Sequence, residues 1–373
     1  MAAEVVDLFT ELAALPSPPG DERAVADAVG RYLRDLGLTV DEDDAGEKVG
    51  SNIGNLYCRL PPTGGGSPIF LCAHLDTVPP TGPIEPVIGD DGVIRNAAGT
   101  ILGADNTSAV AAMLEGARRV LAENRPHGGI ELLFTPKEEV GLLGAAAFDH
   151  ERLHARLGYV YDQAAPIGEV ILGAPFSRAM QIRFHGRAAH SGMYPEEGRS
   201  AVAAAARAIS DLRLGRVDEE TTANVGIIQG GTAGNIIPEW CTLDAEARSH
   251  SERKLEELVQ EMVDAFSFAA GLEDCEVETK VSKSYKGYRF KEDDPVVRIA
   301  HDALERSGYS PAYGLSGGAA DANVFNERGL ACLNLANGMQ DIHTSDERIT
   351  VEDLEGMVEV TLALVDVARD ADA

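Results

Sequence analysis

The chain lacks the features that would place it in a membrane or in an oxidising compartment. None of its 373 residues belongs to a run of the roughly 20 apolar residues that a membrane helix needs. The first residues show no basic region followed by an apolar stretch, so we expect no secretory signal. The five cysteines are scattered and form no CxxC pair, which favours reduced, mostly buried thiols over disulfides or a thiolate metal site. We therefore expect a cytoplasmic protein with no membrane partner.

Positive charge is also scarce. The chain has 32 Lys and Arg against 61 Asp and Glu, a formal net charge of -29, and only 7 of its basic residues are Lys. Binding to nucleic acid needs a basic surface, so we expect no nucleic-acid partner. The acidic balance is typical of a protein adapted to high salt or of an acidic cytosolic enzyme, and it does not identify the chemistry.

The hydrophobic pattern predicts an α/β fold in two domains, because 373 residues exceed what one core usually holds. Expected helices are 21–36 and 106–121, and expected strands are 55–60, 68–73, 130–134 and 157–161. Strands that alternate with helices favour a mixed, mainly parallel sheet flanked by helices.

A different pattern follows residue 177. Strands are expected at 178–185, 222–229, 239–248 and 276–281, and helices at 200–212 and 252–270. This βαββαβ order is that of the ferredoxin-like unit. The first pattern then resumes, with helices at 294–307 and 350–370 and a strand at 331–335. We therefore predict a domain of residues 1–177 and 285–373 that is interrupted by a ferredoxin-like domain of residues 178–284.

Four segments rich in metal-binding residue types lie at or just beyond the ends of expected strands, or before a helix, where open α/β sheets bind ligands. They are AHLDT with His74 and Asp76, GADN with Asp105, TPKEEVG with Glu138 and Glu139, and QDIHTS with His343.

Each segment taken alone also has a plain structural interpretation. His74 could be a hydrogen-bonded core histidine, Asp105 a helix N-cap and the two glutamates a solvated turn. The functional interpretation is chemical. A metal-bound imidazole needs an acceptor such as Asp76 on its second nitrogen, and the adjacent charges of Glu138 and Glu139 repel unless a cation or a proton intervenes.

Taken together, HLDT, GADNTSA, TPKEEVG, a strand ending at Asp162 and the late His343 resemble the M20 family of zinc peptidases, closest to its peptidase T branch. The resemblance covers nearly the whole chain, and the inserted domain resembles the lid or dimerisation domain of that family. It implies two Zn²⁺ ions per chain, with Mn²⁺ or Co²⁺ as alternatives. It also implies a small peptide as substrate and a homodimer formed through the lid domain.

The resemblance assigns a metal-binding role to five matching positions. Asp105 would bridge the two ions. His74 and Asp162 would complete one site, and Glu139 and His343 would complete the other.

Catalytic and substrate-binding roles follow in the same way. Asp76 would orient His74, and Glu138 would be the general base. In the lid domain, His190 of GRAAHSG would stabilise the tetrahedral oxyanion, reaching across a dimer interface. Asn235 of GGTAGNIIP and Arg248 would contact the substrate, although a simple turn and a surface ion pair are the plain interpretations of these two. The segment 316–321 matches a Gly-rich active-site loop of the family, without an assigned role.

These residues predict a dinuclear zinc exopeptidase that hydrolyses short peptides, a tripeptide or dipeptide aminopeptidase. The segment around His190 differs from that of the tripeptidases and favours a peptidase T-like sub-branch. Two alternatives stay open. One is a metal-dependent amidohydrolase that removes an N-acyl or N-carbamoyl group from amino acids. The other is a non-catalytic peptide-binding homologue, which the presence of all five ligands and Glu138 disfavours.

Overall fold

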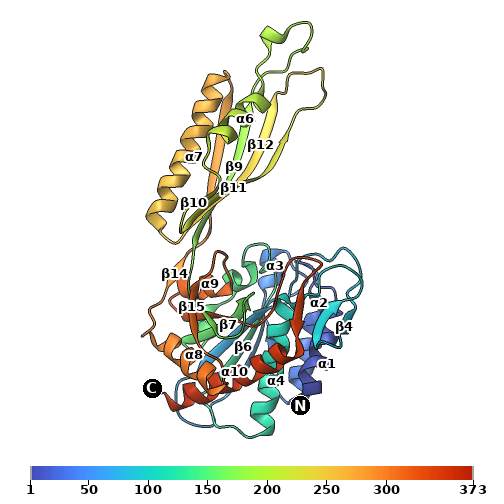
Figure 1. Cartoon of the computed structure of the whole chain (residues 1–373), viewed down its shortest axis with the longest axis vertical. Helices are drawn as coiled ribbons and strands as arrows, with labels where there is room; N and C mark the ends of the chain where they lie inside the picture. The colour runs from blue at the N-terminus through green and yellow to red at the C-terminus, as the bar shows by residue number, and fades with distance from the viewer. Residues whose placement is uncertain (1, 372–373) are drawn as a thin grey trace. The chain divides into compact units, whose positions relative to one another are not determined.

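The computed structural model describes residues 2–371, which form two compact units (Figure 1). The first unit contains the chain up to Gly173 and again from Arg289 onward, and the second is the continuous segment Ala174–Tyr288. Each unit has its own buried apolar core. None of the helices within residues 2–371 combines the length and the apolar character needed to span a lipid bilayer.

The first unit is built on a nine-stranded mixed sheet. Its order is β1 (Val40–Glu42), β2 (Leu56–Leu60), β6 (Ile130–Thr135), β3 (Ile69–His74), β7 (Leu157–Gln163), β16 (Ala331–Ala336), β8 (Glu169–Ala174) and β14 (Tyr288–Arg289), with β15 (Ala312–Leu315) beside β8. The central strands β6, β3, β7 and β16 run parallel, whereas β2 and β8 join them antiparallel. The predicted mixed, mainly parallel sheet is confirmed.

Strand β3 is buried along its whole length, as an apolar strand in the middle of a covered sheet should be. Alternate residues of β3 belong to the main core together with α4 (Ala104–Ala122) and α10 (Val351–Asp370). Phe70 is an intervening residue of β3, and it packs against Phe325 of α9 (Asp321–Glu327), with ring centroids 4.9 Å apart. Because successive side chains of a strand point to opposite faces, α9 covers the face opposite to α4 and α10.

The other helices of this unit are α1 (Ala2–Ala13), α2 (Arg23–Asp35), α3 (Ala45–Val49), α5 (Leu143–Ala147), η1 (His150–Arg152) and α8 (Pro295–Arg306). Helices α1, α4, α8 and α10 form one layer of neighbours (Figure 1). The helices predicted at 21–36, 106–121, 294–307 and 350–370 are confirmed, with small shifts at their ends. A three-stranded sheet of β4 (Pro86–Ile88), β5 (Val93–Asn96) and β17 (Arg348–Thr350) was not predicted, because strands this short and partly exposed leave no periodic apolar pattern.

The second unit is a five-stranded antiparallel sheet with two long helices. Its order is β10 (Gly215–Asp218), β11 (Thr221–Gly230), β12 (Trp240–Ser249), β9 (Phe176–His185) and β13 (Glu276–Tyr285), and its helices are η2 (Pro195–Glu197), α6 (Ala201–Asp211) and α7 (Glu252–Leu272). Without β10, the strand order is that of the ferredoxin-like unit, as predicted. Strand β10 is an added edge strand that pairs with β11.

Candidate metal centre

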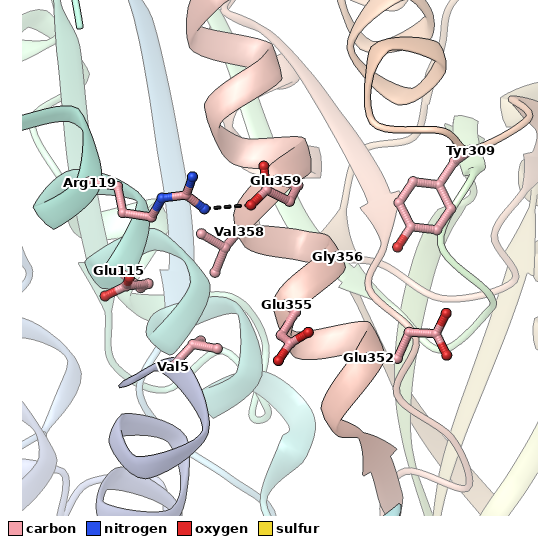
Figure 2. A pocket seen from close by; sticks show the side chains of 9 residues that line it. All are labelled: Val5, Glu115, Arg119, Tyr309, Glu352, Glu355, Gly356, Val358 and Glu359. Atoms are coloured by element: carbon pink, nitrogen blue, oxygen red, sulfur yellow. Dashed lines mark hydrogen bonds and ion pairs between the residues drawn. The ribbon is translucent and has the colours of Figure 1, made fainter. Parts of the chain in front are cut away.

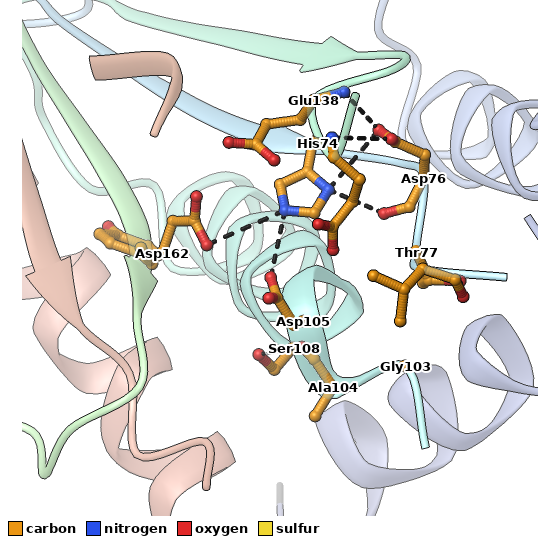
Figure 3. Close-up of polar contacts among 12 residues, drawn as sticks. His74, Asp76, Thr77, Gly103, Ala104, Asp105, Ser108, Glu138 and Asp162 are labelled. Carbon is orange, nitrogen blue, oxygen red and sulfur yellow. Dashed lines mark hydrogen bonds and ion pairs between the residues drawn. The ribbon is translucent and has the colours of Figure 1, made fainter. Parts of the chain in front are cut away.

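Parallel strands bring three of the predicted site residues to one edge of the sheet. His74 is the last residue of β3, Asp162 lies near the end of β7, and Glu138 follows three residues after the end of β6. The carboxyl ends of parallel strands share one edge, so segments far apart in the sequence place these side chains together. Figure 3 shows the carboxylates of Glu138 and Asp162 on one side of the His74 ring and Asp76 on the other.

Asp105 lies between two histidines. It stands in the first turn of α4, and Gly103 before it adopts a positive φ of 76° that a residue with a side chain rarely takes. Asp105 Oδ1 lies 3.1 Å from His74 Nε2, and Asp105 Oδ2 lies 3.1 Å from His343 Nε2. One carboxylate therefore links two imidazoles that are 269 residues apart in the sequence, 343 minus 74.

The remaining predicted ligands complete the cluster. Glu139 Oε1 lies 3.0 Å from His343 Nε2, and Asp162 Oδ1 lies 3.9 Å from His74 Nε2. The ligand atoms of His74, Asp105 and Glu139 lie within 4.8 Å of one another, as do those of His74, Glu138 and Asp162. The structure thus gathers all five predicted ligands and Glu138, although distance alone does not separate the proposed base from the ligands.

Burial and neighbouring charges raise the pKa of three groups of this cluster. Burial, with the neighbouring charge of Asp105, raises the pKa of Asp162 to about 7. Burial also raises the pKa of Glu138 well above its usual value, and the nearby carboxylates Asp162 and Asp321 add to this. Hydrogen bonds with Asp105 and Glu139 raise the pKa of His343 to about 10. Negative charge exceeds positive charge in a buried space, which is the condition that a bound cation relieves.

The donor set fits divalent metal ions. Two imidazole nitrogens and three carboxylates are available, a mixture that suits Zn²⁺ and also Mn²⁺ or Co²⁺. Asp105 offers one oxygen to each side, which is the arrangement of a bridging ligand. His74 and Asp105 are 2 % and 6 % exposed in their side chains and His343 is 46 % exposed, so one side of the cluster is deep and the other is accessible.

Asp76 acts on two segments at once. Its backbone carbonyl lies 2.7 Å from His74 Nδ1, whereas its carboxylate Oδ1 lies 3.6 Å from that nitrogen. The carboxylate instead accepts the backbone N–H groups of Glu138 at 2.8 Å and of Glu139 at 3.1 Å. Asp76 is fully buried. The acceptor that holds the His74 ring is therefore the carbonyl, and the carboxylate holds the loop that carries the proposed base.

The three predicted substrate-binding residues belong to the second unit. Two loops of this unit carry His190 and Asn235, and backbone bonds join them, among them Ser191 N–H to Asn235 O at 3.0 Å and Ile237 N–H to Ala189 O at 2.9 Å. His190 and Asn235 are both exposed. Arg248, on β12, is half-buried and pairs with Glu246 at 2.9 Å.

Two buried carboxylates near the cluster were not predicted from the sequence as site residues. Glu347 accepts backbone N–H groups from the loop before Asp105. Asp321, at the end of the Gly-rich segment 316–321, accepts the Thr135 hydroxyl at 2.5 Å and the Cys72 thiol at 3.7 Å. The Gly-rich segment indicated Asp321 in the sequence, but no sequence feature distinguished Glu347 from the many other acidic residues.

A cavity of about 430 Å³ lies apart from this cluster, among α1, α4 and α10 (Figure 2). Four of its nine lining residues are glutamates, and the ion pair between Arg119 and Glu359 crosses one side of it. Glu115 on this lining is ten residues along α4 from Asp105, roughly 15 Å at the rise of an α-helix. The cavity contains none of the predicted site residues.

Comparison with known families matches two parts of the chain. Residues 177–272 match the peptidase dimerisation domain of the M20 type, and residues 55–171 match peptidase family M28. The first match falls on the second unit and the second on the strands and loops that carry His74, Asp105, Glu139 and Asp162.

Several whole chains are also similar. The protein YqjE of Bacillus subtilis, which is uncharacterized, is 37% identical over 98% of both chains. The crystal structure of aminopeptidase PepT from Bacillus cereus has a TM-score of 0.89 and 39% identity, and covers 99% of both chains. That of a tripeptidase from Staphylococcus aureus has a TM-score of 0.95 and 34% identity, and covers 100% of this chain and 99% of the other.

Proposed function

The chain belongs to the M20 family of metallopeptidases, and from this premise we propose that it is an aminopeptidase that releases the N-terminal residue of short peptides, tripeptides or dipeptides. The observation that carries the proposal is the bridging position of Asp105 between His74 and His343, with Glu138 buried beside them. The similarity to an aminopeptidase and a tripeptidase over the whole chain supports the substrate class.

We propose that the site holds two divalent ions, zinc in the first place and Mn²⁺ or Co²⁺ as alternatives. Asp105 would be shared between them, His74 and Asp162 would bind on one side, and Glu139 and His343 on the other. When bound, such a pair of ions lowers the pKa of a water molecule and polarises the scissile carbonyl.

Glu138 would act as the general base. It is close to the ligands without the histidine contact that Glu139 makes, and its burial raises its pKa, which favours a group that takes and returns protons. Its carboxylate would take the proton of the attacking water and return it to the leaving amine. Asp76 would hold Glu138 in place through the backbone N–H that it accepts.

The second unit would complete the substrate site. His190 would stabilise the oxyanion of the tetrahedral intermediate from the partner subunit of a homodimer, and Asn235 and Arg248 would bind the peptide. The match of this unit to a peptidase dimerisation domain supports a dimer. We also propose that the enzyme works in the cytoplasm, because its five cysteines are all unpaired.

A substrate panel tests the reaction class. The metal-loaded protein is offered tripeptides and dipeptides with a free amino terminus, the same peptides with an acetylated terminus, and N-acetyl and N-carbamoyl amino acids. Turnover of the free-amine peptides with release of the N-terminal residue supports the proposal. Turnover of only the N-blocked amino acids would establish the amidohydrolase alternative, and metal binding with no turnover of any substrate would favour a binding protein.

A further inference from the structure

Glu347 is a buried glutamate whose carboxylate is bound entirely by backbone groups of a distant loop. Oε2 accepts the N–H groups of Leu102 and Gly103, both at 2.8 Å, and Oε1 accepts the N–H of Asp105 at 3.0 Å. The residue is 2 % exposed. Bringing an ionised carboxylate out of water costs several kcal/mol unless hydrogen bonds replace its hydration, and here three N–H groups do so.

The loop is shaped to present these N–H groups. Gly103 has a positive φ of 76°, and a Cβ there would lie 3.3 Å from the Thr77 side chain, so glycine suits the turn in both respects. The three N–H groups stand at the start of α4, where the helix dipole also favours a negative charge. The Glu347 carboxylate therefore fixes the backbone of the residue whose side chain bridges the two histidines.

The other end of Glu347 is anchored in the loop that carries His343. Gln340 and Arg348 close this loop by two backbone hydrogen bonds of 2.9 and 3.1 Å. His343 stands inside the loop with a positive φ of 63°, and Glu347 lies directly before the closing residue. Glu347 thus belongs to one ligand-bearing loop and holds the other.

These contacts form a closed ring. One side is the direct contact of 3.1 Å between the Asp105 side chain and His343 Nε2. The other side runs from His343 along four residues to Glu347 and through its carboxylate to the Asp105 N–H. Because the second side consists of backbone and the Glu347 carboxylate and includes no metal-binding atom, it can hold the two ligands at a fixed separation whether or not a cation is bound.

We propose that Glu347 is a positioning residue, which sets the separation of Asp105 and His343 so that both can bind the same metal ion. It touches neither substrate nor metal and acts through the two ligands. The inference rests on the proposed function, since it needs the five residues to be a metal site. Removing such a supporting contact typically weakens metal affinity or activity by about ten- to a hundredfold.

The test compares Glu347→Gln with Glu352→Gln. Both substitutions remove one negative charge, but Glu352 is exposed on α10, five residues further along the chain. Zinc affinity and the number of ions bound are measured by titration of the metal-free protein, with kcat and KM measured at saturating zinc. We expect Glu347→Gln to bind the more weakly held ion about ten- to a hundredfold less tightly than the parent. Its kcat should fall by a larger factor than its KM rises. Glu352→Gln should match the parent in zinc affinity, kcat and KM.

A purely structural role gives a different result. If Glu347→Gln lowers only the melting temperature of the metal-free protein, with parental zinc affinity and kcat, the proposal is overturned. If that variant does not fold, Glu347→Asp takes its place, because it keeps the charge but is too short to reach all three N–H groups. Parental zinc affinity and kcat in Glu347→Asp would also overturn the proposal, and a tenfold or greater loss of affinity would support it.

The parent itself provides a second measurement. Hydrogen exchange of the metal-free parent should show slow exchange at the amides of Leu102, Gly103 and Asp105, and exchange as fast as in an open loop would contradict the proposal. If the proposed function itself is wrong, the parent will bind no divalent ion or hydrolyse no peptide. That outcome differs from every result named above for the Glu347 variants.

Discussion

The carboxylate of Asp76 accepts the backbone N–H of Glu138 at 2.8 Å, while the backbone carbonyl of Asp76 faces His74 Nδ1 at 2.7 Å. One buried residue therefore holds a proposed ligand through its main chain and the proposed base through its side chain. The two contacts can be separated by mutation, because a side-chain substitution leaves the carbonyl in place.

Replacing Asp76 by Asn should reduce catalysis more than metal binding. The amide has one acceptor oxygen, so one of the two N–H groups of Glu138 and Glu139 would lose its acceptor. We expect kcat to fall about ten- to a hundredfold, with zinc affinity lowered much less. Asp91→Asn, in an exposed turn and paired with Arg95, is the matched control. Equal losses of affinity and kcat would show that the carboxylate acts through His74 instead.

Zinc binding near neutral pH should release protons. Hydrogen bonds with Asp105 and Glu139 raise the pKa of His343 to about 10, so its imidazole is protonated at pH 7.5 in the metal-free protein. A nitrogen that binds metal must be neutral, and that proton must leave. Titration calorimetry in buffers with different ionisation enthalpies measures the number released.

Two histidine variants test whether a proton released on zinc binding comes from His343. His343→Ala should release about one proton fewer than the parent and bind zinc more weakly. His154→Ala, at an exposed position, should match the parent in both respects. Because a raised pKa means that protons compete with zinc, affinity should fall as pH falls. Proton release that does not change in His343→Ala would contradict the account.

Close packing of α4 against α10 should make Gly116 intolerant of a methyl group. A Cβ at Gly116 would lie 2.7 Å from Cγ2 of Thr361, a side chain buried in the helix layer. We expect Gly116→Ala to lower the free energy of unfolding of the first unit by about 1 to 3 kcal/mol, since overpacking outweighs the better helix propensity of alanine. Calorimetric unfolding measures the change.

Gly271→Ala provides the contrast. Gly271 lies in α7, and no atom comes within 4 Å of a Cβ built there. This substitution should raise the stability of the second unit by about 0.5 to 1 kcal/mol. A stabilising Gly116→Ala would mean that the two helices are less tightly packed than the structure shows.

The sequence predicted those elements whose apolar pattern is long and regular. Helices α4 and α10, and strands β3 and β6, bury continuous or periodic apolar residues, so their type could be read directly. Strands β4, β5 and β17 were missed because they are short and partly exposed. Strands β4 and β5 pair as neighbours in the sequence, whereas β17 joins β5 from near the other end of the chain.

The same distinction holds for the site. His74, Asp105, Glu139 and His343 could be proposed as ligands because they stand in recognisable motifs at strand and helix ends. Glu347 could not, because its role depends on N–H groups 245 to 242 residues earlier in the chain, which only the folded chain brings within reach. The Asp76 carboxylate was expected to hold His74; its Oδ1 lies 3.6 Å from His74 Nδ1, and its shorter contact, 2.8 Å, is with the backbone N–H of Glu138, which only the folded chain brings within reach.

The most direct test of the account is hydrolysis of a free-amine tripeptide by the zinc-loaded parent and by Glu138→Gln, with the metal content of both measured in the same samples. Glu138→Gln keeps the size of the side chain and all five proposed ligands, so it should bind as much zinc as the parent. We expect the parent to release the N-terminal residue and the variant to be slower by about 10² to 10⁴, the usual contribution of a general base. A variant with full zinc content and parental kcat would show that Glu138 is not the base and would contradict the central claim.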